Sequence, residues 1–222
     1  YLGLALACAR KMTVARDPSP AQREVLDRGL LVSGFNCVLQ MPTGAGKTYA
    51  VYFGPLAELI DERREGPVTG LRVLFVTPLR AMSRDIELAL KQPVLDLGVK
   101  IKVESRTGDT SSAVRARQRV ELPHVLITTP ESLSLLLTRD NCPDLFAGVR
   151  SVIVDEWHEL LSSKRGTQTE LALARLRRIA PGVRTWALSA TLSNLEEAAC
   201  AAVGVSADVN RVGRDGAQGR CE

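Results

Sequence analysis

Short runs of apolar and β-branched residues alternate along this chain with longer stretches whose apolar residues recur at helical spacing. Six such runs predict strands, at residues 37–41, 72–77, 100–105, 124–129, 151–156 and 185–190. Helical stretches lie between most of them, at 46–64, 79–91, 130–138, 167–179 and 194–203. The strand residues are continuously apolar rather than alternating, which is typical of a sheet covered on both faces. The pattern therefore predicts an α/β fold with a doubly wound, mostly parallel sheet and helices on both faces.

The two ends of the chain carry a weaker pattern. Near the start, Ser19 is placed to cap a helix that begins with Pro20 and runs to about Gly34, and Gln22 would close its capping box. Residues 205–222 show no periodicity and predict a tail or a linker. The predicted organisation is an N-terminal extension at 1–17, one α/β domain at 18–204, and the tail at 205–222.

Composition and charge narrow the class of protein without assigning a function. The 222 residues are 45% hydrophobic and 24% charged, as in ordinary soluble globular proteins, and no apolar run reaches the length of a membrane span. The net charge of +4 permits nucleic-acid binding but does not require it. Five scattered cysteines without a CxxC pair fit neither a disulfide framework nor a zinc site. Because the chain also lacks an initiator Met and a signal-peptide pattern, we expect a cytoplasmic excerpt of a longer protein.

The segment "PTGAGKT" at 42–48 is a candidate phosphate-binding loop, since it follows one predicted strand and opens a predicted helix. Glycines there let backbone N–H groups turn inward around phosphate oxygens at the helix N-terminus. Lys47 would reach the β- and γ-phosphates of a nucleotide, and the Thr48 hydroxyl would ligate Mg²⁺. The pattern GxxxxGK[ST] asks for glycine where this chain has Met41. The alternative is a glycine-rich turn with no ligand.

A second candidate, "DEWHEL" at 155–160, directly follows the apolar run "SVIV". Asp155 would hold Mg²⁺ through water, as a Walker-B aspartate does, and Glu156 would polarise the water that attacks the γ-phosphate. Alone, two carboxylates after a strand would more often be a solvated turn. A phosphate loop on a neighbouring strand end favours the nucleotide site instead.

Over about residues 18–200 the chain resembles the first RecA-like domain of superfamily-2 DExH-box helicases. "DEWHELL" and "SKRG" (163–166) are most similar to the large helicase-related family, in particular its ligase-associated DExH-box branch. In this resemblance "PTGAGKT" is motif I and "DEWH" is motif II, and Gln22 matches the glutamine that reads the adenine edge. The implied nucleotide-binding residues are Gln22, Thr43, Gly44, Ala45, Gly46, Lys47 and Thr48.

The resemblance also implies a nucleic-acid face. "TPLRAMSRD" (77–85), "RTGDT" (106–110) and "TTPESL" (128–133) are similar to motifs Ia, Ib and Ic, which line the strand-tracking face in the family. The implied contact residues are Pro78, Leu79, Arg80, Thr107, Gly108, Thr129, Pro130, Glu131 and Ser132. "SAT", with Ser189, Ala190 and Thr191, matches motif III, which links the nucleotide state to the grip on nucleic acid. We expect His158 to form a hydrogen bond toward this motif.

Several of these residues also have a plain structural interpretation. Gln22 can merely close its capping box, Arg80 and Arg84 can belong to a solvated helix face, and Thr128, Thr129 and Ser132 can cap the helix that begins at Pro130. The basic residues Arg115, Arg117 and Arg119 fit a surface better than a site, and Lys164 and Arg165 are undecided. His124 is expected to be structural, and Trp157 to pack rather than to stack on a base.

Taken together, the resemblance implies an ATP-dependent helicase or translocase motor domain with ATP and Mg²⁺ as cofactors, in DNA repair. The implied catalytic residues are Lys47, Asp155, Glu156 and His158. Partners would be single-stranded or partly duplex DNA, with RNA or a hybrid left open, a second RecA-like domain and, by family association, a DNA ligase and a nuclease. Because that second domain supplies arginine fingers and does not fit after "SAT", we expect little hydrolysis by this chain alone. The alternatives are an ATPase acting on another kind of partner, or a fragment that binds without catalysis.

Overall fold

The computed structural model describes residues 36–42, 46–191, 194–204, 208–212 and 218–220. The helix predicted from Ser19 and the extension at 1–17 lie outside these residues, as do Gln22, Thr43, Gly44 and Ala45.

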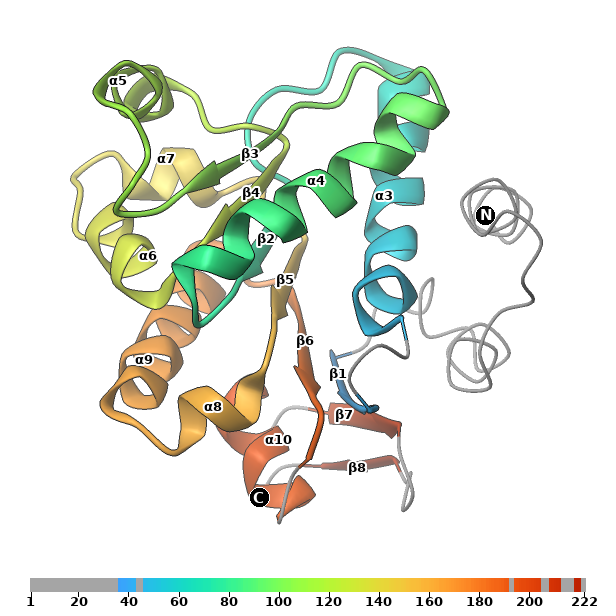
Figure 1. Ribbon diagram of the computed structural model, residues 1–222, viewed down its shortest axis with the longest axis vertical. Helices are drawn as coiled ribbons and strands as arrows, with labels where there is room; N and C mark the ends of the chain where they lie inside the picture. Colours follow the sequence, from blue (N-terminus) through green and yellow to red (C-terminus); the bar gives the residue numbers. More distant parts are fainter. Residues whose placement is uncertain (1–35, 43–45, 192–193, 205–207, 213–217, 221–222) are drawn as a thin grey trace.

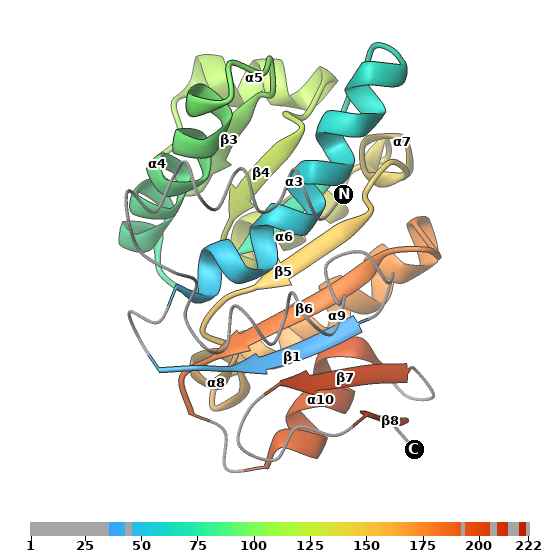
Figure 2. The ribbon, with the colours of Figure 1, turned by 90° about the vertical axis from the view of Figure 1, so that its right-hand side faces the viewer.

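All six predicted strands are present and close to their predicted positions. They are β1 (Asn36–Gln40), β2 (Val73–Val76), β3 (Val103–Arg106), β4 (Val125–Thr128), β5 (Ser151–Val154) and β6 (Arg184–Ser189). They pair in parallel in the order β3-β4-β2-β5-β6-β1. Figure 2 shows β3, β4, β5, β6 and β1 following one another in this order across the sheet. The expected α/β fold with a mostly parallel sheet is confirmed.

Two further strands lie where the sequence predicted only a tail. β7 (Asp208–Val212) pairs in parallel with β1, and β8 (Gln218–Arg220) pairs antiparallel with β7. The expectation of a segment without secondary structure is therefore wrong for these residues. The physical reason is that β1 would otherwise be an edge strand, and its backbone groups provide a template that needs no apolar pattern in the added strand. The domain boundary at residue 204 stays a prediction.

Eight helices are described. They are α3 (Lys47–Glu65), α4 (Arg80–Asp96), α5 (Ser112–Val120), α6 (Pro130–Leu137), α7 (Cys142–Phe146), α8 (Trp157–Leu161), α9 (Lys164–Ile179) and α10 (Leu195–Val203). The sequence did not predict α5, which buries only Gln118, or α7 and α8, which are too short to show periodicity. Across the described part of the chain, no helix has the length and apolarity needed to cross a membrane.

The helices cover the sheet on both faces (Figure 1). Buried apolar side chains form two separate cores, one on each face. Successive strand residues point to opposite faces, so Phe75 packs with α3 and α4 while its neighbour Leu74 packs with the helices of the other face. In the same way, Trp186 belongs to the first core and Ala187 to the second. The second core also includes residues of α6, α8, α9 and α10. Continuous apolar strands are explained by this double burial.

The turn from α8 into α9 depends on a glycine. Gly166 is buried, and its N–H donates to the Ser163 carbonyl at 2.9 Å. A Cβ on Gly166 would lie 2.5 Å from the Leu160 carbonyl oxygen and 3.1 Å from the Leu161 Cα. These are backbone atoms of α8, so a small side-chain movement cannot relieve the overlap. Glycine at this position lets the start of α9 approach α8.

We expect Gly166→Ala to lower the free energy of unfolding by about 1–3 kcal/mol, because overpacking against backbone outweighs the better helix propensity of alanine. Denaturant unfolding followed by circular dichroism measures the change. Gly182→Ala is the matched control, since a Cβ there meets nothing within 4 Å. Equal stability of the two variants would contradict the close contact.

Candidate functional site

The sequence motifs meet along one edge of the sheet. The strands β1 to β6 are parallel, so their carboxyl ends share that edge, and each is followed by one of the predicted segments. Lys47 and Thr48 follow β1, and Asp155 and Glu156 follow β5. Ser189 ends β6, with Ala190 and Thr191 just beyond it. We call this edge the rim.

The start of α3 has the backbone conformation expected of a phosphate-binding helix. Gly46 precedes the helix with φ 80°, a left-handed conformation that favours glycine, and its carbonyl accepts the Ala50 N–H. The first turn of α3 carries no acidic residue. N–H groups at the start of a helix lack intrahelical partners and attract anions. The described part of motif I therefore fits a phosphate group.

Lys47 lies against motif II. Its side chain is 8% exposed, and its Nζ is 3.4 Å from Glu156 Oε1. The phosphate loop and motif II, predicted to lie on neighbouring strands, are separated by β6, which lies between β1 and β5, so that prediction is wrong. The length of the lysine side chain spans the intervening strand. Motif III, at the end of β6, consequently lies between the two halves of the candidate nucleotide site.

Asp155 is the buried carboxylate of the rim, at 5% exposed. Its Oδ1 accepts the Glu156 N–H at 3.0 Å. Its pKa is raised to about 6, first by burial and then by the neighbouring charge of Glu156. A divalent cation would offset both effects, and a carboxylate together with the Thr48 hydroxyl at the start of α3 is the oxygen chemistry that Mg²⁺ accepts. The residues fit the predicted metal.

Glu156 is held in a strained backbone conformation. It has φ 46° and ψ 49°, and within the described ranges it alone among non-glycine residues has a positive φ. A left-handed conformation costs a non-glycine residue roughly 1–3 kcal/mol and persists where the surroundings impose it, often at functional sites. Here it turns the chain from β5 into α8 and leaves Asp155 and Glu156 side by side at the rim.

A chain of polar contacts connects motif II with motif III. The Ser189 hydroxyl donates to the Thr191 carbonyl at 2.9 Å and lies 3.0 Å from His158 Nδ1. Because this hydroxyl has a single hydrogen, His158 Nδ1 is the donor to Ser189 Oγ. The same Nδ1 is 3.5 Å from Glu156 Oε2. The predicted hydrogen bond from His158 toward motif III is therefore present.

Motifs Ia and Ib come together beside α4. The Arg80 guanidinium lies directly over Gly108, so a Cβ on that glycine would be 2.7 Å from Arg80 Cζ. Arg80 Nη1 is also 3.8 Å from Asp109 Oδ1, with both side chains exposed. A cavity of about 660 Å³ opens here, lined by Arg80, Ala81, Ser83, Arg84, Glu87, Leu88, Lys91, Ser105, Thr107, Asp109 and Thr110. Leu79 stands exposed nearby, at 54%.

Arg115 has a structural role that the sequence analysis did not predict. Its Nη2 donates to the carbonyl of Thr107 at 3.1 Å and to that of Gly108. Arg117, by contrast, pairs with Glu104 at 2.7 Å on the surface. Arg115 thus holds the motif Ib turn from α5, and a basic stretch of polar sequence gave no signal of this contact.

Motif Ic forms the start of α6. The Thr129 hydroxyl accepts the Ser132 N–H at 3.5 Å as the helix cap and donates to Ser132 Oγ at 3.3 Å, with Pro130 in the first turn. The capping interpretation is therefore correct. It does not conflict with a nucleic-acid contact, because the positive end of a helix dipole also attracts phosphates.

Two residues with structural interpretations have the expected surroundings. Trp157 is fully buried and donates its indole N–H to the Ala198 carbonyl at 2.8 Å. His124 Nδ1 accepts the Lys102 N–H at 2.9 Å, and its Nε2 is 2.9 Å from the Val68 carbonyl. Burial lowers the pKa of His124, which favours the neutral imidazole, as does the hydrogen bond accepted by Nδ1. Both predictions are confirmed.

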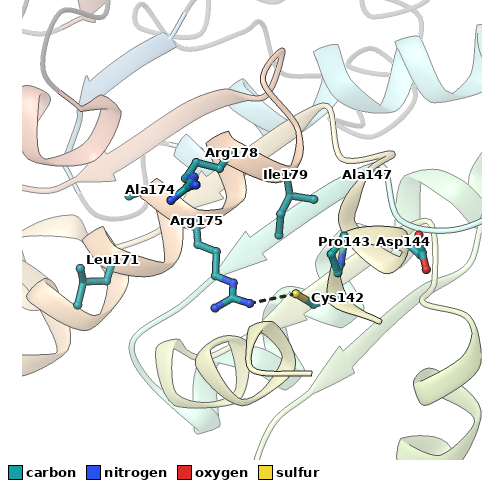
Figure 3. A pocket seen from close by; sticks show the side chains of 9 residues that line it. All are labelled: Cys142, Pro143, Asp144, Ala147, Leu171, Ala174, Arg175, Arg178 and Ile179. Carbon is teal, nitrogen blue, oxygen red and sulfur yellow. Dashed lines mark hydrogen bonds between the residues drawn. The ribbon is translucent and has the colours of Figure 1, made fainter. Parts of the chain in front are cut away.

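A second open cavity, of about 810 Å³, lies between α7 and α9 (Figure 3). Its lining includes Cys142 and Arg175, whose Nη2 is 3.5 Å from the Cys142 sulfur. None of the predicted site residues lines this cavity. α7 precedes the start of β5, so the cavity belongs to the edge of the sheet opposite the rim.

A sequence profile of the DEAD/DEAH box helicases matches residues 19–198, which include every motif at the rim. The chain belongs to the DEAD/DEAH box helicase family.

Relatives of this helicase domain carry the Lhr name. The chain is 38% identical over 201 residues to "ATP-dependent helicase Lhr-Core" of Methanocaldococcus jannaschii, covering 86% of this chain and 23% of that protein. It is also 38% identical over 194 residues to "Lhr helicase/ probable uracil glycosylase" of Mycolicibacterium smegmatis, covering 82% of this chain and 12% of that protein. The chain thus spans less than a quarter of the length of either relative.

Solved structures agree on the fold. The helicase Lhr of Mycobacterium smegmatis, bound to ssDNA and AMP-PNP, superposes with a TM-score of 0.77 at 33% identity, over 92% of this chain and 27% of that one. The helicase MrfA, bound to DNA and AMPPNP, gives a TM-score of 0.76 at 22% identity, over 97% of this chain and 29% of that one. The fold of the helicase domain is therefore RecA-like. The ligase-associated branch stays a prediction.

We expect the stability of the metal-free domain to depend on the ionisation of Asp155. Because its folded-state pKa is raised, its contribution is fully present below about pH 4 and is lost as the pH rises through about 6. Asp155→Asn cannot ionise, so between pH 4 and pH 8 it should gain roughly 3 kcal/mol in free energy of unfolding relative to the parent chain. Denaturant unfolding in EDTA at several pH values measures this difference.

Asp144→Asn provides the control, since Asp144 is exposed on α7 far from the rim. The expected result is that only the Asp155 variant changes the shape of the pH curve. Parallel curves for the parent and Asp155→Asn would rule out a destabilising charge at the rim.

Proposed function

We propose that this domain is the ATP-binding motor half of a nucleic-acid helicase or translocase. The observation that carries the proposal is the arrangement of Lys47, Asp155 and Glu156 at the rim, with Lys47 Nζ 3.4 Å from Glu156 Oε1 beside the start of α3. A cation, two carboxylates and a helix N-terminus are the groups that hold and hydrolyse a nucleoside triphosphate. Family membership supports the same activity.

In the proposed reaction the motif I residues hold the nucleotide. Thr43, Gly44, Ala45 and Gly46 surround the phosphates, Lys47 moves from Glu156 to the β- and γ-phosphates, and Gln22 contacts adenine. Thr48 and Asp155 would hold Mg²⁺, which neutralises charge on the phosphates when bound. Glu156 orients a water toward the γ-phosphorus and takes its proton as the bond to the ADP oxygen breaks. The AMP-PNP in the Lhr structure supports this class of ligand.

Motifs Ia, Ib and Ic would hold the backbone of single-stranded DNA. Their residues at the rim are Pro78, Leu79, Arg80, Thr107, Gly108, Thr129, Pro130, Glu131 and Ser132. The exposed Arg80 guanidinium beside Gly108 and the positive end of the α6 dipole support backbone contacts rather than contacts with base edges. We therefore infer little base preference and strong salt dependence. The solved Lhr structure holds ssDNA and the solved Mss116 structure holds ssRNA, so the choice between DNA and RNA is a question for experiment.

Motif III would report the nucleotide state to that grip. The contacts from Glu156 through His158 to Ser189 and Thr191 support this role, since they begin at the proposed catalytic carboxylate and end beyond β6. A second RecA-like domain would close on the rim and supply arginine fingers, which raise related rates roughly 10³–10⁵-fold. We infer weak hydrolysis by this chain alone. A role in cytoplasmic DNA repair with a ligase and a nuclease rests on the family resemblance.

Glu156→Gln should abolish ATP hydrolysis, with a rate at least about 100-fold lower, because the amide cannot take the proton from water. ATP affinity should stay within about threefold, since one polar group replaces another of the same shape. Single-turnover hydrolysis and fluorescent-ATP titration measure the two quantities. Glu121→Gln, at an exposed position, is the control. Unchanged turnover in Glu156→Gln would remove Glu156 from this role.

Single-stranded DNA should raise the ATPase rate of the domain. Both DNA binding and this stimulation should weaken steeply between about 50 and 200 mM salt, because binding releases counterions from the DNA and added salt opposes that release. Oligonucleotides of different base sequence should act alike. Parallel assays with RNA of the same sequence identify the preferred strand. Equal rates with and without any nucleic acid would instead favour an ATPase that acts on another kind of partner.

A further inference from the structure

The "SKRG" segment contributes a side chain to the rim that none of the motifs accounts for. Arg165, in the first turn of α9, donates from Nε to Glu131 Oε1 at 2.6 Å and from Nη2 to Glu131 Oε2 at 3.2 Å. Its Nη2 also donates to the Pro78 carbonyl. One guanidinium therefore donates hydrogen bonds from two of its nitrogens to a carboxylate, and from one of them also to a backbone carbonyl.

These contacts connect two loops of the proposed nucleic-acid face. Pro78 follows β2, and Glu131 follows β4, the strand that pairs with β2. The two residues belong to motifs Ia and Ic, and Arg165 lies 87 and 34 residues away from them in sequence. A second bond, from Gln168 Nε2 to Ser134 Oγ at 2.9 Å, ties the same part of α9 to α6. The start of α9 thus fixes where the two loops lie relative to each other.

The geometry separates Arg165 from an ordinary surface ion pair. The side chains of Arg165 and Glu131 are 34% and 45% exposed, and a simple pair at that exposure would contribute little to stability. Burial raises the pKa of the Glu131 carboxyl, but hydrogen bonds and charge from Arg165, with help from the Glu131 backbone and Thr129, lower it overall. Because the planar guanidinium of Arg165 bonds both the Glu131 carboxylate and the Pro78 carbonyl, it restricts how these two groups are oriented. A flexible surface ion pair does not impose such a restriction.

Arg165 is also close to motif II along the chain. Only α8 and Ser162–Ser163 separate the strained Glu156 from the start of α9. Gly166, the next residue after Arg165, brings α9 into backbone contact with Leu160 of α8. Arg165 thus lies beside a close backbone contact between α8 and α9, with no room there for a side chain.

We propose that Arg165 is a positioning residue that sets the distance between the motif Ia and motif Ic loops, so that both hold one nucleic-acid backbone. The inference rests on the proposed function, since it assigns to these loops the contacts proposed above. Arg165 acts through Pro78 and Glu131, and both of its grips are needed. Lysine cannot make them together, because a single ammonium lacks the planar fork.

Removal of the Glu131 charge distinguishes positioning from electrostatics. If charge alone governed the face, Glu131→Gln would strengthen binding to a polyanion, since it removes a negative charge. Positioning requires the opposite: the loops separate, and affinity falls. A double-mutant cycle between Arg165 and Glu131 should be far from additive, because either change removes the same pair.

The experiment measures binding of a fluorescent oligo(dT) to the 222-residue chain by anisotropy, at 50 mM salt and above. We expect Arg165→Ala and Glu131→Gln each to bind about tenfold more weakly, the loss of one charge-assisted pair, and the double variant to be no weaker than about twofold beyond either. Arg165→Lys should stay within about threefold of Arg165→Ala. Fluorescent-ATP affinity should be unchanged in all of them, which shows that the variants are folded.

Arg175→Ala is the matched control. Arg175 lies on the same helix, carries the same charge and also contacts a neighbour, but it lines the cavity with Cys142 away from the rim (Figure 3). It should bind oligo(dT) within about twofold of the parent chain.

Two results would overturn the inference in different ways. If the parent chain binds oligo(dT) but Arg165→Ala matches Arg175→Ala, or Glu131→Gln binds more tightly, Arg165 does not position the loops and the proposed function stands. If the parent chain binds neither oligo(dT) nor a single-stranded RNA of the same length, the proposed function fails and the inference fails with it.

Discussion

The parallel pairing of β1, β6, β5 and β2 is the constraint on which the rest of this domain depends. Both faces of these strands are buried in apolar cores, so their backbone N–H and C=O groups cannot bond water and must pair with each other. The pairing also continues past the strands. The Met41 N–H donates to the Ser189 carbonyl at 3.0 Å, and the Asp155 N–H to the Val76 carbonyl at 2.8 Å. The first residues of the motifs are therefore part of the ladder, which fixes where each loop leaves the sheet.

Placing charged groups at the end of such a core lowers stability locally. Asp155 has a raised pKa because it is buried beside Glu156, and Glu156 itself has a left-handed backbone. A hydrophobic rim would be more stable, as is general where function and stability compete. The close-packed strands below hold these groups in place, so the strain is not relieved by rearrangement. In the proposed mechanism a bound nucleotide and cation would relieve part of it, which favours binding at the rim.

The sequence predicts the strands and the motifs well because both are local. An apolar run such as 151–154 predicts β5, and the glycines of motif I predict the turn into α3. Strand order is not local, and the position of β6 between β1 and β5 therefore could not be predicted from the sequence. β7 was missed for a related reason, since it is determined by the exposed edge of β1 rather than by its own pattern.

Long cationic side chains were the hardest to interpret from sequence. Arg115 and Arg117 are two residues apart, yet the first holds the motif Ib turn and the second pairs with Glu104 on the surface. Arginine can reach in many directions, so its partners depend on tertiary structure that no local pattern encodes.

The role of Met41 also depends on tertiary structure rather than on a local pattern. It replaces the first glycine of the loop pattern, and its burial at 2% exposed gives it a packing role in the first core.

Two routes lead away from Glu156, one to motif III and one to the proposed nucleic-acid face, and they differ physically. The first is polar and short, through His158 and Ser189 to motif III, and it depends on hydrogen bonds that a change of protonation or rotamer can break. The second is steric, through α8 and Gly166 to Arg165, and it depends on the close backbone contact between α8 and α9. A polar route suits a switch between two states, while a packed route suits the transfer of a displacement. The strained backbone at Glu156 lies at the start of both. In the proposed motor, a single change there would therefore alter motif III and the spacing of the Ia and Ic loops together.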